Sequence, residues 1–192
     1  FTPGPGVGGH CIPIDPYYLL WKAREYDFYT RFIELAAETN EAMPYHVVDL
    51  VTRGLNTMGK SLHGAQTLVL GVAFKPDISD ARDTPAERVI ELLLSRGSEV
   101  SYHDPFVPKF HVGGNVFYPE STMLTSVTLT QERIEAADVV VIVTGHHNVN
   151  YSHILRYASL VVDSCNVTHI ERSHLDHTPR AKVIRLGAPF SP

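Results

Sequence analysis

Hydrophobic positions recur at helical spacing through the first third of the chain. From Pro16 to about Met58 the pattern predicts helix, with an interruption near residues 27–30. Asn40 falls on the apolar face of the second helical stretch, and Pro44 is expected to kink or open the helix there. The face itself is one long stripe made of Ile33, Ala36, Ala37, Met43, Val47, Leu50, Val51 and Leu55. Such a stripe needs a partner, either another subunit or a further part of the same protein.

Beyond residue 61 the pattern changes to short apolar runs that alternate with helical stretches. Buried strands are predicted at residues 67–72, 99–103, 139–144, 160–162 and 183–186. Helices are predicted at residues 85–96, 131–137 and 151–157. Residues 110–130 have no clear period and are expected to form a loop that can hold short strands. This alternation predicts an α/β fold with a doubly wound, Rossmann-like parallel sheet, preceded by the long helical segment.

One helix of this region carries a complete start signal. Thr84 is the predicted N-cap, Pro85 takes the first helical position, and Glu87 is placed to close a capping box. Gly97 is expected to end the helix. We therefore divide the chain into a helical segment, residues 1–60, and an α/β domain, residues 61–192.

The composition narrows the class of protein. With 44% hydrophobic and 19% charged residues, the chain of 192 residues is suited to a globular core. A net charge of −5 argues against a basic surface for nucleic acid, and no apolar run is long enough to span a membrane. The two cysteines have neither disulfide nor zinc spacing, and no secretory signal is present, which favours the cytoplasm. Because the chain opens on Phe1 within a loop, we expect it to be a piece of a longer protein.

The most reactive candidate side chain is Cys11, which follows a glycine-rich loop and precedes a helix. Helix N-termini favour the thiolate, and glycines let a substrate approach the backbone closely. The alternative is a small buried residue in a turn, and local chemistry alone does not separate the two. A cysteine peptidase is disfavoured, because sequence neighbours such as His10 and Cys11 rarely present a nucleophile and its base to each other.

Two loops carry further candidate chemistry. Residues 4–9 match G-x-G-x-x-G, but no strand precedes them and prolines interrupt them, so a substrate-facing loop is favoured over a dinucleotide site. Residues 73–83 connect a strand to a helix N-terminus, at the edge where open α/β sheets bind ligands. Lys75 and Arg82 could hold phosphate groups there. The alternative is that both pair with aspartates of the same loop.

The eleven histidines raise the question of a metal site. His146 and His147 follow a predicted strand, and His174 and His177 are three residues apart. Neither pair has a cysteine or carboxylate at a recognisable zinc spacing, so no metal is predicted.

Two separated motifs resemble the UDP-glucose/GDP-mannose dehydrogenase family. The first is Gly-Pro-Gly-Val-Gly-Gly-His-Cys-Ile-Pro-Ile-Asp-Pro, residues 4–16, and the second is Gly-x-x-Phe-Lys-x-x-x-x-Asp-x-Arg-Asp-Thr-Pro, residues 71–85. The wording around the cysteine most resembles the UDP-N-acetylglucosamine 6-dehydrogenase branch, which serves polysaccharide biosynthesis. The resemblance implies a homodimer formed through the long helix, a UDP-sugar substrate and NAD as cofactor.

The resemblance also assigns residues. Cys11 corresponds to the nucleophile that attacks a C6 aldehyde to form a thiohemiacetal and then a thioester, and Asp15 to the acid that assists proton transfer and activates water. Phe74 and Lys75 correspond to residues that contact the nucleotide-sugar, and Arg82 to one that reaches NAD. The loop expected to bind the substrate comprises Gly4, Gly6, Gly8 and Gly9. The implied reaction is a four-electron oxidation of a sugar C6 hydroxyl to a carboxylate.

Two positions depart from the family pattern. Ile14 stands where the UDP-glucose enzymes carry a lysine, which favours an N-acetylated or other sugar. Cys165 stands where an arginine of the family contacts the substrate. The family's N-terminal NAD domain is not part of the sequence, so no turnover is expected from this chain alone. The alternatives are a non-catalytic module for nucleotide-sugar binding and dimerisation, or a dehydrogenase for UDP-glucose or UDP-N-acetylmannosamine.

Overall fold

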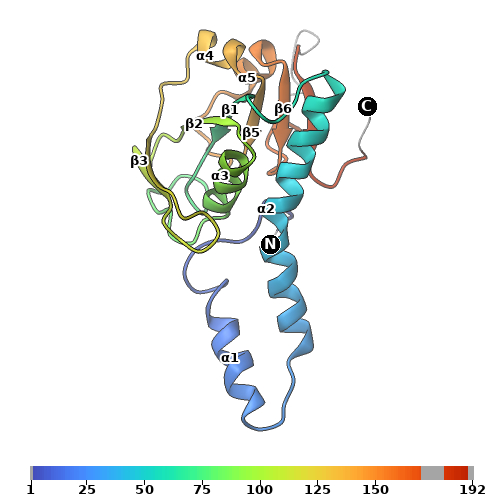
Figure 1. The fold of residues 1–192 in the computed structure, drawn as a ribbon, viewed down its shortest axis with the longest axis vertical. Helices are drawn as coiled ribbons and strands as arrows, with labels where there is room; N and C mark the ends of the chain where they lie inside the picture. Colours follow the sequence, from blue (N-terminus) through green and yellow to red (C-terminus); the bar gives the residue numbers. More distant parts are fainter. Residues whose placement is uncertain (1, 170–179, 190–192) are drawn as a thin grey trace.

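A helical arm projects from an α/β body in the computed structural model, which describes residues 2–169 and 180–189 (Figure 1). The arm consists of α1 (Asp15–Arg24) and the first part of α2 (Arg31–Thr57). The break between them lies where the sequence predicted it. α2 runs through the buried Pro44 as one continuous helix, so the helix does not break there although one backbone hydrogen bond is missing. No described helix is long and apolar enough to cross a membrane.

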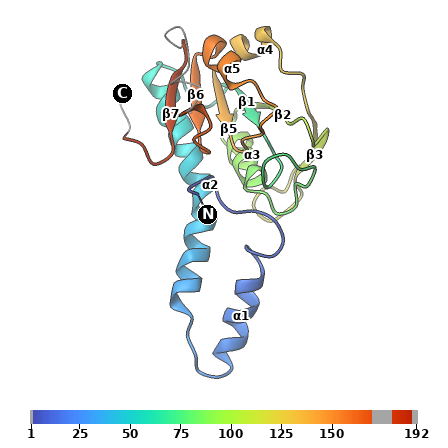
Figure 2. The same ribbon diagram turned by 180° about the vertical axis from the view of Figure 1, so that it is seen from behind.

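The body is built on a parallel sheet of five strands, which confirms the predicted fold class. The strand order is β2-β1-β5-β6-β7, and every neighbouring pair is parallel. Figure 2 shows β7 at the edge of the sheet. The strands are β1 (Gln66–Leu70), β2 (Glu99–His103), β5 (Val139–Ile142), β6 (Leu160–Asp163) and β7 (Lys182–Arg185). All of them fall within two residues of the predicted ranges.

Helices cover both faces of the sheet, because its strands are apolar on both sides. On one face, α3 (Pro85–Ser95) and the second half of α2 pack over a core that includes Val51, Val69 and Val141. On the other face, α4 (Gln131–Ala136) and α5 (Tyr151–Tyr157) cover a second cluster around Leu68 and Val140. α2 therefore belongs to the arm with its first half and to the body with its second, and the division at residues 60/61 stays a prediction.

The poorly periodic segment contains a short antiparallel hairpin, formed by β3 (Lys109–Gly113) and β4 (Ser121–Thr125). This hairpin also changes the start of α3. The Thr84 hydroxyl caps the helix by accepting from Ala86 N–H at 3.3 Å, with Pro85 in the first turn, as predicted. Glu87 does not complete the capping box, because its carboxylate engages the backbone of Gly113 instead.

One buried carboxylate ties the carboxyl ends of the strands together. Asp104, 3% exposed, follows β2 and accepts hydrogen bonds from four backbone N–H groups, those of Val72, Ala73, Phe106 and Val107, at 2.7–3.1 Å. It also pairs with His146 Nε2 at 3.0 Å, beyond β5. Burial by itself would raise the pKa of Asp104, but His146 and the backbone donors outweigh it, and the pKa is lowered to about 2.

We predict that Asp104→Asn destabilises the chain by about 3 kcal/mol at pH 7, because the amide cannot replace a carboxylate that accepts five hydrogen bonds. The folded-state pKa lies below that of the unfolded chain, so this stabilisation is complete above about pH 4 and is lost as the pH falls towards 2. Urea unfolding between pH 2 and 7 measures both effects. The control is Asp49→Asn on the exposed side of α2. A penalty that does not shrink at low pH would contradict the prediction.

Candidate functional site

The two motifs that are some sixty residues apart in sequence meet directly in the structure. Gly9 N–H donates to the carbonyl of Arg82 at 3.2 Å. A Cβ atom added at Gly8 would lie 2.7 Å from the Asp83 carbonyl oxygen and 2.9 Å from Phe74 Cβ. At Gly9, whose φ is +86°, it would lie 3.0 Å from the Phe74 ring. Only glycine fits this approach, so the cysteine loop is held against the loop of residues 73–83.

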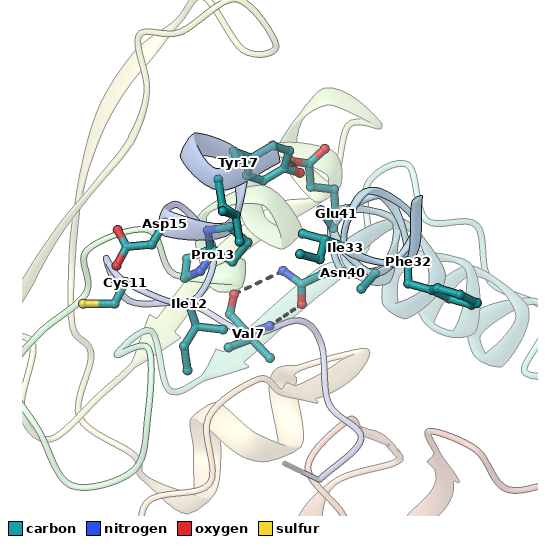
Figure 3. A pocket seen from close by; sticks show the side chains of 14 residues that line it. Val7, Cys11, Ile12, Pro13, Asp15, Tyr17, Phe32, Ile33, Asn40 and Glu41 are labelled. Atoms are coloured by element: carbon teal, nitrogen blue, oxygen red, sulfur yellow. Dashed lines mark hydrogen bonds between the residues drawn. The ribbon is translucent and has the colours of Figure 1, made fainter. Parts of the chain in front are cut away.

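A side chain of α2 holds the other end of the glycine loop. Asn40 Oδ1 accepts from Val7 N–H at 2.7 Å, and its Nδ2 donates to the Val7 carbonyl at 3.2 Å (Figure 3). Pro44 has no N–H to offer the Asn40 carbonyl, which lies 3.4 Å from the position of a Cβ on Gly6. The interruption of the helical bonding at Pro44 therefore faces the glycine loop. Gly4 has nothing within 4 Å of its added Cβ, so packing does not require glycine there.

Cys11 is exposed, not buried in a turn. Its carbonyl accepts from the N–H of Asp15 at 2.8 Å, where α1 begins. Figure 3 shows the thiol and the Asp15 carboxylate on the same side of the loop, away from α2. His10 Nδ1 lies 3.5 Å from Cys11 Sγ. The expectation that these sequence neighbours do not meet is therefore wrong.

The cations of residues 73–83 behave differently from each other. Arg82 forms a forked ion pair with Asp80, with Nη2 to Oδ2 at 2.6 Å and Nε to Oδ1 at 3.0 Å. That pairing lowers the pKa of Asp80 to about 2. Lys75 has no carboxylate within ion-pair distance among the described residues, and its Nζ lies 5.6 Å from the centre of the Phe74 ring. The aspartate-pairing alternative holds for Arg82 only, and Lys75 is available for an anionic ligand.

Polar contacts clamp this loop onto the segment after β5. Asp77 N–H donates to His146 Nδ1 at 3.0 Å, and the Asp77 carboxylate accepts from His147 N–H at 3.0 Å and also contacts the His147 ring. The Thr144 hydroxyl donates to the Ala73 carbonyl at 2.6 Å. His146 and His147 thus hold the loop of residues 73–83 against the segment after β5. No group of three potential metal ligands occurs among residues 2–169 and 180–189, and His174 and His177 lie outside that part of the chain.

The position where an arginine was expected is filled by a half-buried thiol. Cys165 Sγ donates to the Val143 carbonyl at 3.0 Å, and burial raises the pKa of Cys165 to about 12. A cation does reach this loop from the neighbouring strand, because Arg185 on β7 is paired in register with Asp163. Arg185 Nη1 lies 3.4 Å from Asn166 Oδ1.

A groove of about 830 Å³ separates the cysteine loop and α1 from the first half of α2. Tyr17 bridges it by donating to Glu41 at 2.6 Å, and burial, followed by Glu41, raises the pKa of Tyr17 to about 12. The lining is mostly apolar and consists of Val7, Cys11, Ile12, Pro13, Asp15, Pro16, Tyr17, Leu19, Phe32, Ile33, Ala36, Ala37, Asn40 and Glu41. Such a lining suits packing against apolar side chains, not the phosphates of a nucleotide.

The glycine-rich residues 4–9 are engaged by other parts of the chain. They lie in a loop, with Val7 bonded to Asn40 of α2 and with Gly8 and Gly9 against Phe74. Arg82 is the only described residue that we assign to NAD, and it is already paired with Asp80.

The sequence singles out Cys11, Phe74, Lys75 and Arg82 as candidate site residues, and the structure brings their two loops into contact. The sequence missed the residues that organise these loops. Asn40 could have been found, because it is a polar residue on the apolar stripe of the helix. Its hydrogen bond with Val7 explains why a polar side chain lies there. The pairing of Asp104 with His146 gave no signal in sequence, because the two residues meet only through the parallel order of β2, β1 and β5.

Comparison with known proteins finds matches along most of the chain. A family model described as the UDP binding domain of the UDP-glucose/GDP-mannose dehydrogenase family matches residues 68–170, and the model of that family's central domain matches residues 1–42. Among curated proteins, the UDP-N-acetyl-D-mannosamine dehydrogenase of Methanococcus maripaludis is 35% identical over 145 residues, which are 76% of this chain and 30% of that protein.

Solved structures give the same picture. The UDP-D-ManNAc dehydrogenase of Pyrococcus horikoshii superposes with a TM-score of 0.76 at 28% identity, over 97% of this chain and 40% of that one. The NDP-N-acetyl-D-galactosaminuronic acid dehydrogenase of Methanosarcina mazei gives 0.70 at 28% identity, over 87% of this chain and 36% of that one. The chain thus spans 30–40% of the length of these relatives.

These names correct one expectation. The residues around Cys11 favoured the UDP-N-acetylglucosamine branch. The relatives from M. maripaludis and P. horikoshii are instead UDP-N-acetylmannosamine dehydrogenases, which the sequence had left open as an alternative. The family itself is shown by the profile match, since residues 68–170 are 103 of the 192 residues. This chain belongs to the UDP-glucose/GDP-mannose dehydrogenase family, and comprises its UDP-binding domain together with part of its central domain.

Proposed function

We propose that this chain is the C-terminal region of an NAD-dependent UDP-sugar 6-dehydrogenase, with Cys11 as its nucleophile. The observation that carries the proposal is the contact of Gly8 and Gly9 with Phe74 and Asp83, which holds an exposed thiol beside the candidate nucleotide loop. Among substrates we favour UDP-N-acetylmannosamine, because it is the sugar named for the mannosamine relatives. Ile14 agrees with an N-acetylated sugar.

The chain's own residues would act in a fixed order. Lys75 and Phe74 bind the nucleotide at the carboxyl edge of the sheet, where parallel sheets bind ligands. This leaves the sugar towards the glycine loop. Cys11 then adds to the C6 aldehyde, and Asp15, on the same side of the loop, assists the water that hydrolyses the thioester. NAD supplies the hydride acceptor when bound, and Arg82 is the residue of this chain that would contact it.

A second reading concerns this chain alone. It would bind a UDP-sugar and dimerise without turnover, as a non-catalytic module. The first half of α2 and the neighbouring α1 expose Phe32 (88%), Trp21 (65%) and Leu35 (58%), which is an apolar surface that a second copy would cover. The proposed assembly is therefore a homodimer through α2, in the cytoplasm.

In the full-length enzyme, Cys11→Ala should lower NADH formation from UDP-N-acetylmannosamine by about a thousandfold or more, because no thioester can form. Steady-state absorbance assays with UDP-N-acetylmannosamine, UDP-N-acetylglucosamine and UDP-glucose measure turnover and rank the sugars. Cys165→Ala is the matched control, since that thiol donates to a backbone carbonyl. Unchanged turnover in Cys11→Ala would exclude Cys11 as the nucleophile.

For binding, we expect Lys75→Met to weaken UDP affinity of this chain by about tenfold or more, with a smaller dependence on salt, because one phosphate contact is lost. Isothermal calorimetry at two salt concentrations measures both. Lys60→Met is the control, because Lys60 pairs with Asp138 near the amino end of β1, the opposite edge of the sheet. Equal affinities of the two variants would contradict a phosphate contact of Lys75.

For assembly, Phe32→Glu should dissociate the dimer by placing a charge on its apolar surface. Light scattering coupled to size exclusion measures the mass of the particle. Val116→Glu, an equally exposed apolar position (89%) on the β3–β4 hairpin, is the control. A mass that stays dimeric in Phe32→Glu, or that is monomeric in the unaltered chain, would contradict dimerisation through α2.

A further inference from the structure

The His10 ring lies against the thiol that we assign as the nucleophile. Nδ1 of His10 and Sγ of Cys11 are 3.5 Å apart, within hydrogen-bonding distance for sulfur, and both side chains are exposed. Exposure leaves the imidazole open to exchange protons with water, and it leaves the sulfur open to a substrate. This geometry is that of a base beside a nucleophile.

Two charged residues of the neighbouring loop, Asp80 and Arg82, interact electrostatically with this His10–Cys11 pair. The pKa of Asp80 is lowered to about 2, by its hydrogen bonds from Arg82 first and by the charge of His10 as a further contribution. The pKa of Arg82 is raised, by Asp80 first and by Cys11 among the lesser causes. A carboxylate thus lies within electrostatic reach of the imidazole, and a guanidinium within reach of the thiol. The hydrogen bond from Gly9 to Arg82 holds the two loops in register.

These charges match the products of one proton transfer. If the thiol proton moves to His10, the imidazolium lies near the Asp80 carboxylate and the thiolate lies near the Arg82 guanidinium. Each new charge then has an opposite charge within electrostatic reach. Asp15 does not have this role in the structure, because its only hydrogen bond with Cys11 runs from its backbone N–H to the Cys11 carbonyl.

We propose that His10 is a catalytic residue, the base that takes the proton from Cys11. This rests on the proposed function. The S–H bond breaks and the proton moves to Nδ1 of His10, while the sulfur adds to the carbonyl carbon of the aldehyde. The carbonyl oxygen then takes the proton back from His10, and a thiohemiacetal forms with no net change in protons. A histidine suits this shuttle, since its usual pKa of about 6.5 lies closer to that of a thiol than a carboxylate's does.

The test needs neither NAD nor a sugar, because it measures the thiol itself. Iodoacetamide alkylation of this chain at pH 7, followed by intact mass, reports Cys11 alone, since burial raises the pKa of Cys165 to about 12. We expect His10→Gln and His10→Asn to slow the alkylation of Cys11 by about tenfold or more. In both variants the reaction depends on free thiolate alone, so the rate should fall steeply as the pH is lowered from 8 to 5, whereas the unaltered chain should react faster than the variants at the lower pH. Asp80→Asn should slow the reaction by a smaller factor.

The controls separate the chemistry from the fold. His46→Gln removes an exposed histidine of α2 and should leave the rate unchanged. A variant that unfolds exposes Cys165 and adds a second alkylation, which the mass reveals. Equal rates and equal pH profiles for the unaltered chain, both His10 variants and His46→Gln would overturn the proposal.

The two proposals fail in different ways. If Cys11→Ala is inactive but His10→Gln is alkylated at the normal rate, His10 is rejected as the base and Cys11 remains the nucleophile. If His10→Gln is alkylated slowly but Cys11→Ala keeps full turnover, His10 interacts with the Cys11 thiol but Cys11 is not the nucleophile. That result overturns His10 as a catalytic residue.

Discussion

The close approach of the glycine loop to residues 73–83 is the contact on which the candidate site depends. At Gly8 there is room for a hydrogen atom but not for a methyl group, since the Asp83 carbonyl and Phe74 occupy the space. The backbone bond from Gly9 to Arg82 fixes the register of the two loops. Because Cys11 follows two residues after Gly9, this contact brings the cysteine loop against the loop of residues 73–83, and the thiol is exposed.

That contact needs a rigid loop on the other side, and a buried carboxylate provides it. Asp104 gathers the backbone N–H groups that follow β1 and β2 and pairs with His146, whose other ring nitrogen accepts from Asp77 N–H. The carboxyl ends of three adjacent strands are thereby joined through one ionised side chain. A ligand at this edge would meet preorganised loops, which spares the entropy of ordering them on binding.

The arm differs from the body in the large apolar surface that it exposes. Its groove and outward face are apolar and exposed, and the polar contacts within it, such as Tyr17 with Glu41 and Asn40 with Val7, are few and specific. These polar contacts fix how the glycine loop and α1 lie against α2, whereas the apolar face is exposed in this chain. One continuous helix carries both tasks, since the second half of α2 lies in the core of the body.

Local signals in the sequence determined the elements of this protein. Thr84 and Pro85 start α3 because a cap and a fixed φ act within one turn, and apolar runs such as residues 139–142 form buried strands wherever they pack. The two motifs also identified the family from the sequence alone. Tertiary structure decided what joins them: Glu87 turned to the hairpin, Asn40 bound the glycine loop, and His10 met Cys11. Such contacts depend on how the folded backbone brings residues together, which the spacing of residues along the chain does not reveal.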